Sequence, residues 1–192
     1  MGKAFIKPSA SATTIIGSSD GPTSVFIASG NHKPDLKQKL QKKSFELRKK
    51  WYALWIKPGT HTMEEVAEYI RKKYRFVEHT KESPKYQRLC QELRSSFIMQ
   101  YEPQLLGEYA ALPEELFSLE YYYFEKQDKD LHMEIQLESR FEYIGGSTSG
   151  KKISKFHKIY KDVYKYYGVS EEDIKNHTKR YEDLLRQLAM RH

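Results

Sequence analysis

The sequence predicts a mostly α-helical bundle that carries a short β-hairpin or docked arm at its N-terminus. Two observations favour this fold class. Beyond residue 30, apolar residues recur at helical spacing, and the periodic segments are bounded by N-cap residues, glycines and prolines. Residues 1–30, in contrast, are rich in Ser, Thr, Gly and Ala and hold two short β-like runs, Thr13–Ile16 and Ser24–Ala28.

A chain of 192 residues suits one domain with a small appendage. We expect residues 1–30 to form the β element and residues 31–192 to form a helical domain. Within that domain, residues 31–57 predict a basic helix, residues 102–142 an acidic segment, and residues 151–190 a C-terminal helical pair.

The basic helix is predicted from Asp35 to Ile56, and the sequence Lys-Pro-Gly-Thr at 57–60 ends it. Its large apolar residues gather near one face, with lysines elsewhere. They are Leu36, Leu40, Leu47, Trp51, Leu54 and Trp55.

Helix starts follow at three further positions. Thr62 and Glu65 form a capping box, which predicts a helix as far as about Phe76. Ser83-Pro84 places proline at the first position of a helix that runs to about Gln100, and 112–115 repeats this arrangement.

The segment from residue 117 to 138 has two readings. We expect a helix there, but Leu131, Met133, Ile135 and Leu137 alternate strictly, and 126–130 is compatible with a turn. A second hairpin, and with it an α+β fold, is therefore the alternative.

The C-terminal pair is clearer. A helix is predicted over 151–167 with Gly168 as its C-cap, and Ser170 with Asp173 caps a second helix that packs antiparallel to the first.

Charge is divided along the chain. Residues 31–57 hold nine Lys or Arg and two acids, so their net charge of +7 equals that of the whole chain. Residues 102–142 hold eleven acids and three bases. The basic and acidic segments either face each other or each face a partner.

The basic helix predicts contact with a polyanion, because Lys and Arg displace counterions and aromatic rings stack on bases. The residues expected to make it are Lys39, Lys42, Lys43, Arg48, Lys49, Lys50 and Trp51, extended by Lys151 and Lys152. The partner is nucleic acid or an acidic protein surface. A solvated helix face, a helix lying on a membrane surface, and pairing with the chain's own acidic segment stay open.

The sequence Gly-Gly-Ser-Thr-Ser-Gly-Lys-Lys at 145–152 fits the spacing of a phosphate-binding loop. However, Lys152 stands where such loops carry Ser or Thr to hold magnesium. We expect a linker that caps the next helix, with phosphate contact as the alternative.

The stretch IIGSSDGPTSVFIASG, at 15–30, resembles the cation-site segment of the β subunit of sodium-ion-translocating decarboxylases, whose motif is G-G-A-D-G-P-T. The resemblance covers sixteen residues, with Ser18-Ser19 in place of Gly-Ala. It implies that Asp20 is a cation ligand and that Ser19 and Thr23 are its oxygen-bearing neighbours. Asp20-Gly21-Pro22 is also typical of a turn, so a turn, a docking element and a cation site all remain open.

Catalysis has little support in the sequence. The seven histidines show no metal-ligand spacing, and we expect no metal, cofactor or catalytic residue. The single cysteine, Cys90, excludes an internal disulfide and favours a cytoplasmic location. No run approaches the roughly 18 apolar residues of a membrane span.

The sequence therefore favours a binding protein, not an enzyme. We expect an adaptor or inhibitor that engages nucleic acid or a nucleic-acid-handling protein through its basic helix. One alternative is an ion- or phosphate-binding protein centred on Gly17–Thr23 or Gly145–Lys152. Another is a structural protein whose fifteen tyrosines help to build an oligomer; the sequence leaves the oligomeric state open.

Overall fold

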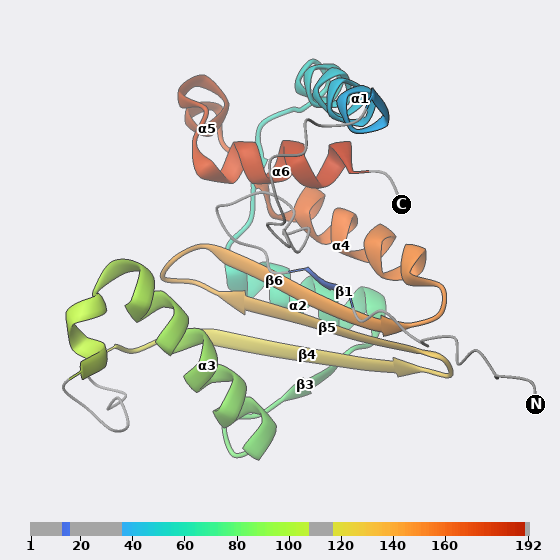
Figure 1. Cartoon of the computed structure of the whole chain (residues 1–192). Helices are drawn as coiled ribbons and strands as arrows, with labels where there is room; N and C mark the ends of the chain where they lie inside the picture. Colours follow the sequence, from blue (N-terminus) through green and yellow to red (C-terminus); the bar gives the residue numbers. More distant parts are fainter. Residues whose placement is uncertain (1–12, 16–35, 108–116, 191–192) are drawn as a thin grey trace, which may run out of the picture.

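The computed structural model describes residues 13–15, 36–107 and 117–190, and it shows an α+β fold built on an antiparallel sheet. The prediction of an α-helical bundle is therefore wrong. The helices are present, but they are arranged around a sheet that the sequence suggested only as an alternative (Figure 1).

The sheet has the strand order β1-β6-β5-β4-β3, and every neighbouring pair is antiparallel. Its strands are β1 (Thr13–Ile15), β3 (Val77–His79), β4 (Tyr121–Asp128), β5 (Leu131–Glu138) and β6 (Tyr143–Gly150). Strands β4, β5 and β6 form a meander of eight-residue strands, which makes up the centre of the sheet.

Six α-helices are described. They are α1 (Leu36–Ala53), α2 (Met63–Tyr74), α3 (Pro84–Tyr101), α4 (Ile153–Tyr167), α5 (Glu171–Asn176) and α6 (Lys179–Ala189). A 3-10 helix covers Pro103–Gly107, and two short strands, β2 (Gly59–Thr60) and β7 (Gly168–Val169), pair separately from the main sheet.

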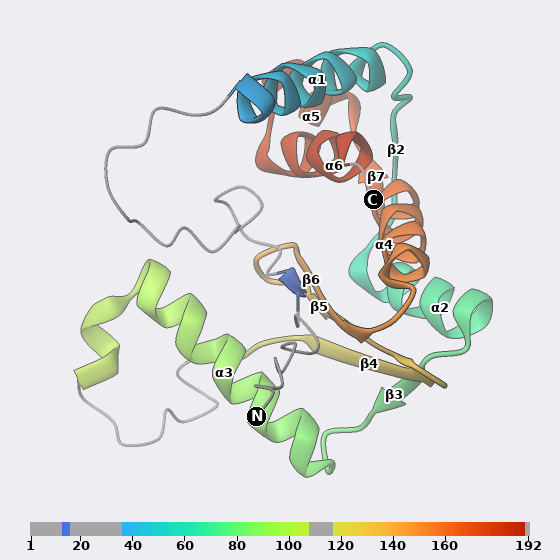
Figure 2. The same cartoon turned by 45° about the vertical axis from the view of Figure 1, so that its right-hand side comes forward.

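The helices lie on both faces of the sheet, and each face has its own core. Helices α2, α4 and α6 share the larger core with the apolar residues of β4, β5 and β6. Helix α3 builds the smaller core on the opposite face, against Tyr121 and Tyr123 of β4. Figures 1 and 2 show α6 beyond α4, and α1 beyond α6, at the end of the molecule away from the sheet.

The segment 117–138 forms a hairpin, so the preferred prediction of a helix is wrong there. Leu131, Met133, Ile135 and Leu137 all point into the larger core, as their alternation requires of a strand with one buried face. The positions between these apolar residues carry His132 and other polar residues, which face the other side of the sheet. Pairing with β3 and β6, two strands outside this segment, favours the hairpin over a helix.

The glycine-rich sequence at 145–150 is strand β6, neither a linker nor a phosphate-binding loop. It pairs with β5 along its whole length and with β1 on its other edge. Its backbone groups are therefore used in the sheet. Glycine is needed at Gly146 because the rings of Phe156 and Tyr160 lie directly against its backbone.

The helix boundaries that depend on local chemistry are confirmed. Thr62 and Glu65 make both hydrogen bonds of a capping box, and so do Ser170 and Asp173. Gly168 ends α4 with a positive φ of 65°. The second C-terminal helix is interrupted at His177, whose left-handed backbone separates α5 from α6.

The expected N-terminal β element is described only at β1, which lies within the predicted run Thr13–Ile16 and pairs with β6. The second run, Ser24–Ala28, and the helix start at 112–115 lie outside the described residues. Within the described ranges, no helix is both long and apolar enough to cross a bilayer.

We predict that Gly146→Val destabilises the protein by about 1–3 kcal/mol, because the new side chain would overpack the core. Even a Cβ atom at this position would lie 2.7 Å from Tyr160 Cε2 and 2.8 Å from Phe156 Cζ. Urea unfolding measures the difference. Ser149→Val, at an exposed position of the same strand, is the control. Equal tolerance of both changes would contradict the packing of β6 against α4.

Candidate functional site

The predicted site residues fall into three groups. Ser19, Asp20, Gly21 and Thr23 of the N-terminal motif lie outside the described residues. The predicted residues of the basic segment lie on α1; they are Lys39, Lys42, Lys43, Arg48, Lys49, Lys50 and Trp51. Lys151 and Lys152 lie between β6 and α4.

Helix α1 contributes no fully buried residue and exposes its apolar stripe. Leu36, Leu40, Leu47 and Trp51, with Leu54 and Trp55 just beyond the helix, are between 55% and 80% exposed. A hollow of about 470 Å³ runs along the helix beside this stripe. It is lined by Lys39, Lys42, Lys43, Glu46, Leu47 and Lys50.

Two of the predicted polyanion-binding residues are used inside the protein. Arg48 Nε donates to the carbonyl oxygen of Ala189 at 2.6 Å, and Lys49 Nζ lies 2.8 Å from a carboxylate oxygen of Glu182. Tyr52 and Ala53, at the end of the helix, pack against the edge of the larger core. This side of α1 therefore attaches the helix to α6, and the opposite side carries the exposed stripe.

Lys151 and Lys152 are exposed but do not extend the surface of α1. The backbone N–H of Lys151 donates to the carbonyl oxygen of Asp130 at 2.7 Å, which places it beside the β4–β5 turn. Figures 1 and 2 show the start of α4 beside the sheet and α1 at the far end of the molecule.

The acidic segment 102–142 does not cover α1 in its described part. Its residues from 121 to 138 form the β4–β5 hairpin, whereas α1 packs on α6. Glu138 is fully buried and accepts hydrogen bonds from the backbone N–H groups of Arg140 and Phe141. That acid stabilises the turn before β6.

A second polar group of residues lies on the face of the sheet that α3 covers. Glu125 and Glu134 are direct cross-strand partners of β4 and β5, and His132 lies two residues before Glu134 on the same face. His79 joins them from β3, and Lys85 from the first turn of α3. We call these five residues the His–Glu cluster.

Glu125 and Glu134 connect the members of the cluster. His79 Nε2 lies 2.7 Å from Glu125 Oε2, and His132 Nε2 lies 2.6 Å from Glu125 Oε1. The Lys85 ammonium lies 3.0 Å from Glu125 Oε1 and 3.2 Å from Glu134 Oε1. One ammonium thus bridges two carboxylates that would otherwise repel each other across the strands.

Two hydroxyl groups hold Glu134 in place. Tyr123 donates to Glu134 Oε1 at 2.7 Å, and Ser147 donates to Glu134 Oε2 at 2.6 Å. Both oxygens of this carboxylate therefore have a fixed direction. The side chains of the cluster are 16–33% exposed, which leaves the group open to ions from solvent.

The partners shift the pKa values of the charged groups. Burial alone would raise the pKa of Glu125, but hydrogen bonds from His132, Lys85 and His79 outweigh it and lower the pKa to about 2. Burial likewise opposes the charge of Lys85, yet hydrogen bonds to both carboxylates raise its pKa. The two carboxylates stay ionised and Lys85 stays protonated over the neutral range.

Reasoning from the sequence missed this cluster. Alternation along β5 does place His132 and Glu134 on one face once a strand is assumed. The sequence spacing does not link them to His79, Lys85 or Glu125. These residues come together only through the pairing of β3, β4 and β5 and through the position of the first turn of α3.

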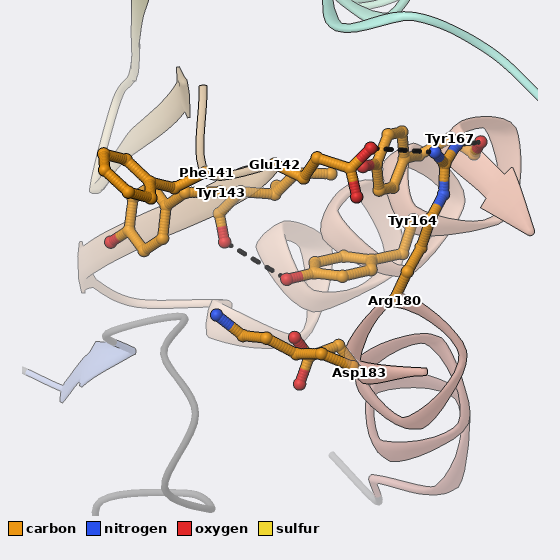
Figure 3. A pocket seen from close by; sticks show the side chains of 9 residues that line it. Phe141, Glu142, Tyr143, Tyr164, Tyr167, Arg180 and Asp183 are labelled. Atoms are coloured by element: carbon orange, nitrogen blue, oxygen red, sulfur yellow. Dashed lines mark hydrogen bonds and ion pairs between the residues drawn. The ribbon is translucent and has the colours of Figure 1, made fainter. Parts of the chain in front are cut away.

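The cavity in Figure 3 lies between the start of β6 and the helices α4 and α6. Its volume of about 50 Å³ leaves room for a few water molecules only. The Cζ atom of the Arg180 guanidinium lies 3.6 Å from the centroid of the Tyr167 ring. The guanidinium also donates hydrogen bonds to the carbonyl oxygens of Gly168, at 2.9 Å, and Tyr167, at 2.7 Å. Arg180 therefore stabilises this junction of the chain, and the cavity is too small for an organic ligand.

Comparison of the chain with models of protein families, with curated proteins and with solved structures found no match in any of the three.

We predict that Glu125→Gln reduces the acid sensitivity of the protein. A carboxyl whose pKa is lowered from 4.5 to about 2 on folding contributes stability above pH 4.5 and loses it as the pH falls toward 2. Between pH 5 and pH 2, the wild type should lose on the order of 3 kcal/mol more unfolding free energy than the variant.

Urea unfolding at several pH values measures this difference. Glu172→Gln, at an exposed position of α5, is the matched control and should leave the acid profile unchanged. Parallel profiles of Glu125→Gln and the wild type would contradict the described contacts of Glu125.

Proposed function

We propose that this chain is a binding protein that engages an acidic protein surface through the outer face of α1. The observation that carries the proposal is an apolar stripe, bordered by lysines, that projects from a helix attached to the protein by its other side.

The attachment of α1 makes its outer face available. Arg48 and Lys49 bind α6, and Tyr52 with Ile56 packs on the edge of the larger core. A helix fixed in this way presents its outer residues on an ordered backbone, and preorganisation of this kind lowers the cost of binding.

The shape of the stripe favours a helical protein partner. At 3.6 residues per turn, Leu36, Leu40, Leu47 and Trp51 fall within about 60° of the helix circumference. So narrow a stripe is typical of a helix–helix seam, whereas helices that lie in a membrane surface carry a wider apolar face. Duplex nucleic acid offers no comparable apolar complement, since its outer surface is phosphate and sugar.

The charge along the stripe selects the partner. Lys39, Lys43 and Lys50 lie along one border, and Glu46 is the only acid of the helix. An acidic amphipathic helix would match both the apolar stripe and the lysines. Two copies of α1 would place like charges together, so a symmetric dimer through this face is disfavoured.

We predict that a labelled peptide with a leucine seam flanked by glutamates binds the full chain, as measured by fluorescence anisotropy. The double variant Leu40→Ala with Leu47→Ala removes the apolar contacts, and charge reversal of Lys39, Lys43 and Lys50 to Glu removes the electrostatic ones. Each should weaken binding at least about tenfold, because each removes on the order of 1.4 kcal/mol or more.

The control reverses three exposed lysines elsewhere, Lys81, Lys129 and Lys175, with the same change of net charge. It should bind nearly as well as the wild type. Single- and double-stranded DNA, RNA and anionic lipid vesicles complete the set of probes at 50 and 200 mM salt. If one of these binds through α1 and the acidic peptide does not, the proposed protein partner is wrong.

A further inference from the structure

The His–Glu cluster combines two features of a metal-binding site. One oxygen of Glu125, one oxygen of Glu134 and one ring nitrogen of His132 all lie within 4.8 Å of one another. Imidazole nitrogen and carboxylate oxygen are ligands that divalent transition metals such as Zn²⁺ accept together, and three protein ligands leave a coordination position open.

The surroundings of these three residues resemble those of metal ligands. Ligating carboxylates and histidines are normally fixed by further hydrogen bonds. Here Tyr123 and Ser147 fix Glu134, and His79 fixes the second oxygen of Glu125. The ligand atoms are thus oriented by residues of β3, β4 and β6, and the three ligands themselves stand on β4 and β5.

A cation already occupies the position between the two carboxylates. The Lys85 ammonium contacts both, and it reaches them from α3 on a flexible stem that is one-third exposed. A lysine in this place offsets part of the negative charge of the two acids when no metal is bound. Its flexible stem allows the ammonium to turn toward solvent when a metal ion takes its place.

We propose that Glu125, His132 and Glu134 bind a divalent transition-metal ion, with Zn²⁺ as the representative ion, and that Lys85 competes with it for the two carboxylates. His79, Tyr123 and Ser147 are positioning residues of this site. The site lies on the sheet and is independent of the peptide-binding face proposed for α1.

Titration with Zn²⁺, followed by calorimetry and by the melting temperature, tests the proposal on the full chain. The wild type should bind one equivalent. His132→Ala and Glu134→Gln should each weaken binding at least tenfold, since each removes a ligand. Lys85→Met should tighten binding about tenfold or more, because it removes a positive charge next to the ion.

His177→Ala is the matched control, because His177 also lies beside a glutamate, Glu182, but on the exposed surface of α5 and α6. It should bind Zn²⁺ as the wild type does. Co²⁺ added to the wild type should give visible d–d absorption that His132→Ala loses. This spectrum reports the coordination geometry of the bound ion, so its loss in His132→Ala would link the ion to that residue independently of any change in stability.

Three results would overturn the proposal. The first is the absence of Zn²⁺ binding in both the wild type and Lys85→Met. The second is an equal loss of affinity in His132→Ala and His177→Ala, which would place the ion elsewhere. The third is weaker Zn²⁺ binding in a folded Lys85→Met variant, because Lys85 would then support the ion and not compete with it.

Discussion

The register between β4 and β5 is the constraint on which both the core and the His–Glu cluster depend. In this register Phe124 faces Ile135 and Glu125 faces Glu134. A slip by one residue would turn His132 and Glu134 into the larger core and bring its apolar residues to the other face. Apolar burial on one face therefore fixes the polar cluster on the other, and Lys85 offsets the repulsion between its paired glutamates.

The face of α1 that we propose for binding lies outside both hydrophobic cores. The sheet, α2, α4 and α6 bury the larger core, and α3 closes the opposite face. Helix α1 adds little to either core; it is fixed to α6 on one side and exposes leucine and tryptophan on the other. Exposed apolar stripes lower solubility unless a partner covers them, and this supports the docking role that we propose for α1.

The parts that could be predicted from the sequence are those set by neighbouring residues. The capping pairs Thr62–Glu65 and Ser170–Asp173 placed the starts of their helices correctly, because the cap and the first helical turn lie within four residues. The sheet could not be predicted in this way, since β6 becomes a strand only through partners elsewhere in the chain. The periodicity of the sequence predicted the apolar stripe of α1. It could not predict which side of α1 packs on α6, because that depends on contacts with residues more than a hundred positions away.

The most direct test of this account is the nuclear magnetic resonance spectrum of the isotope-labelled full chain. We expect cross-strand nuclear Overhauser effects between residues 125 and 134 and between residues 134 and 147, which report the described register. Helical connectivities between residues three apart over 117–137 would contradict it. They would remove the His–Glu cluster together with the sheet that positions it.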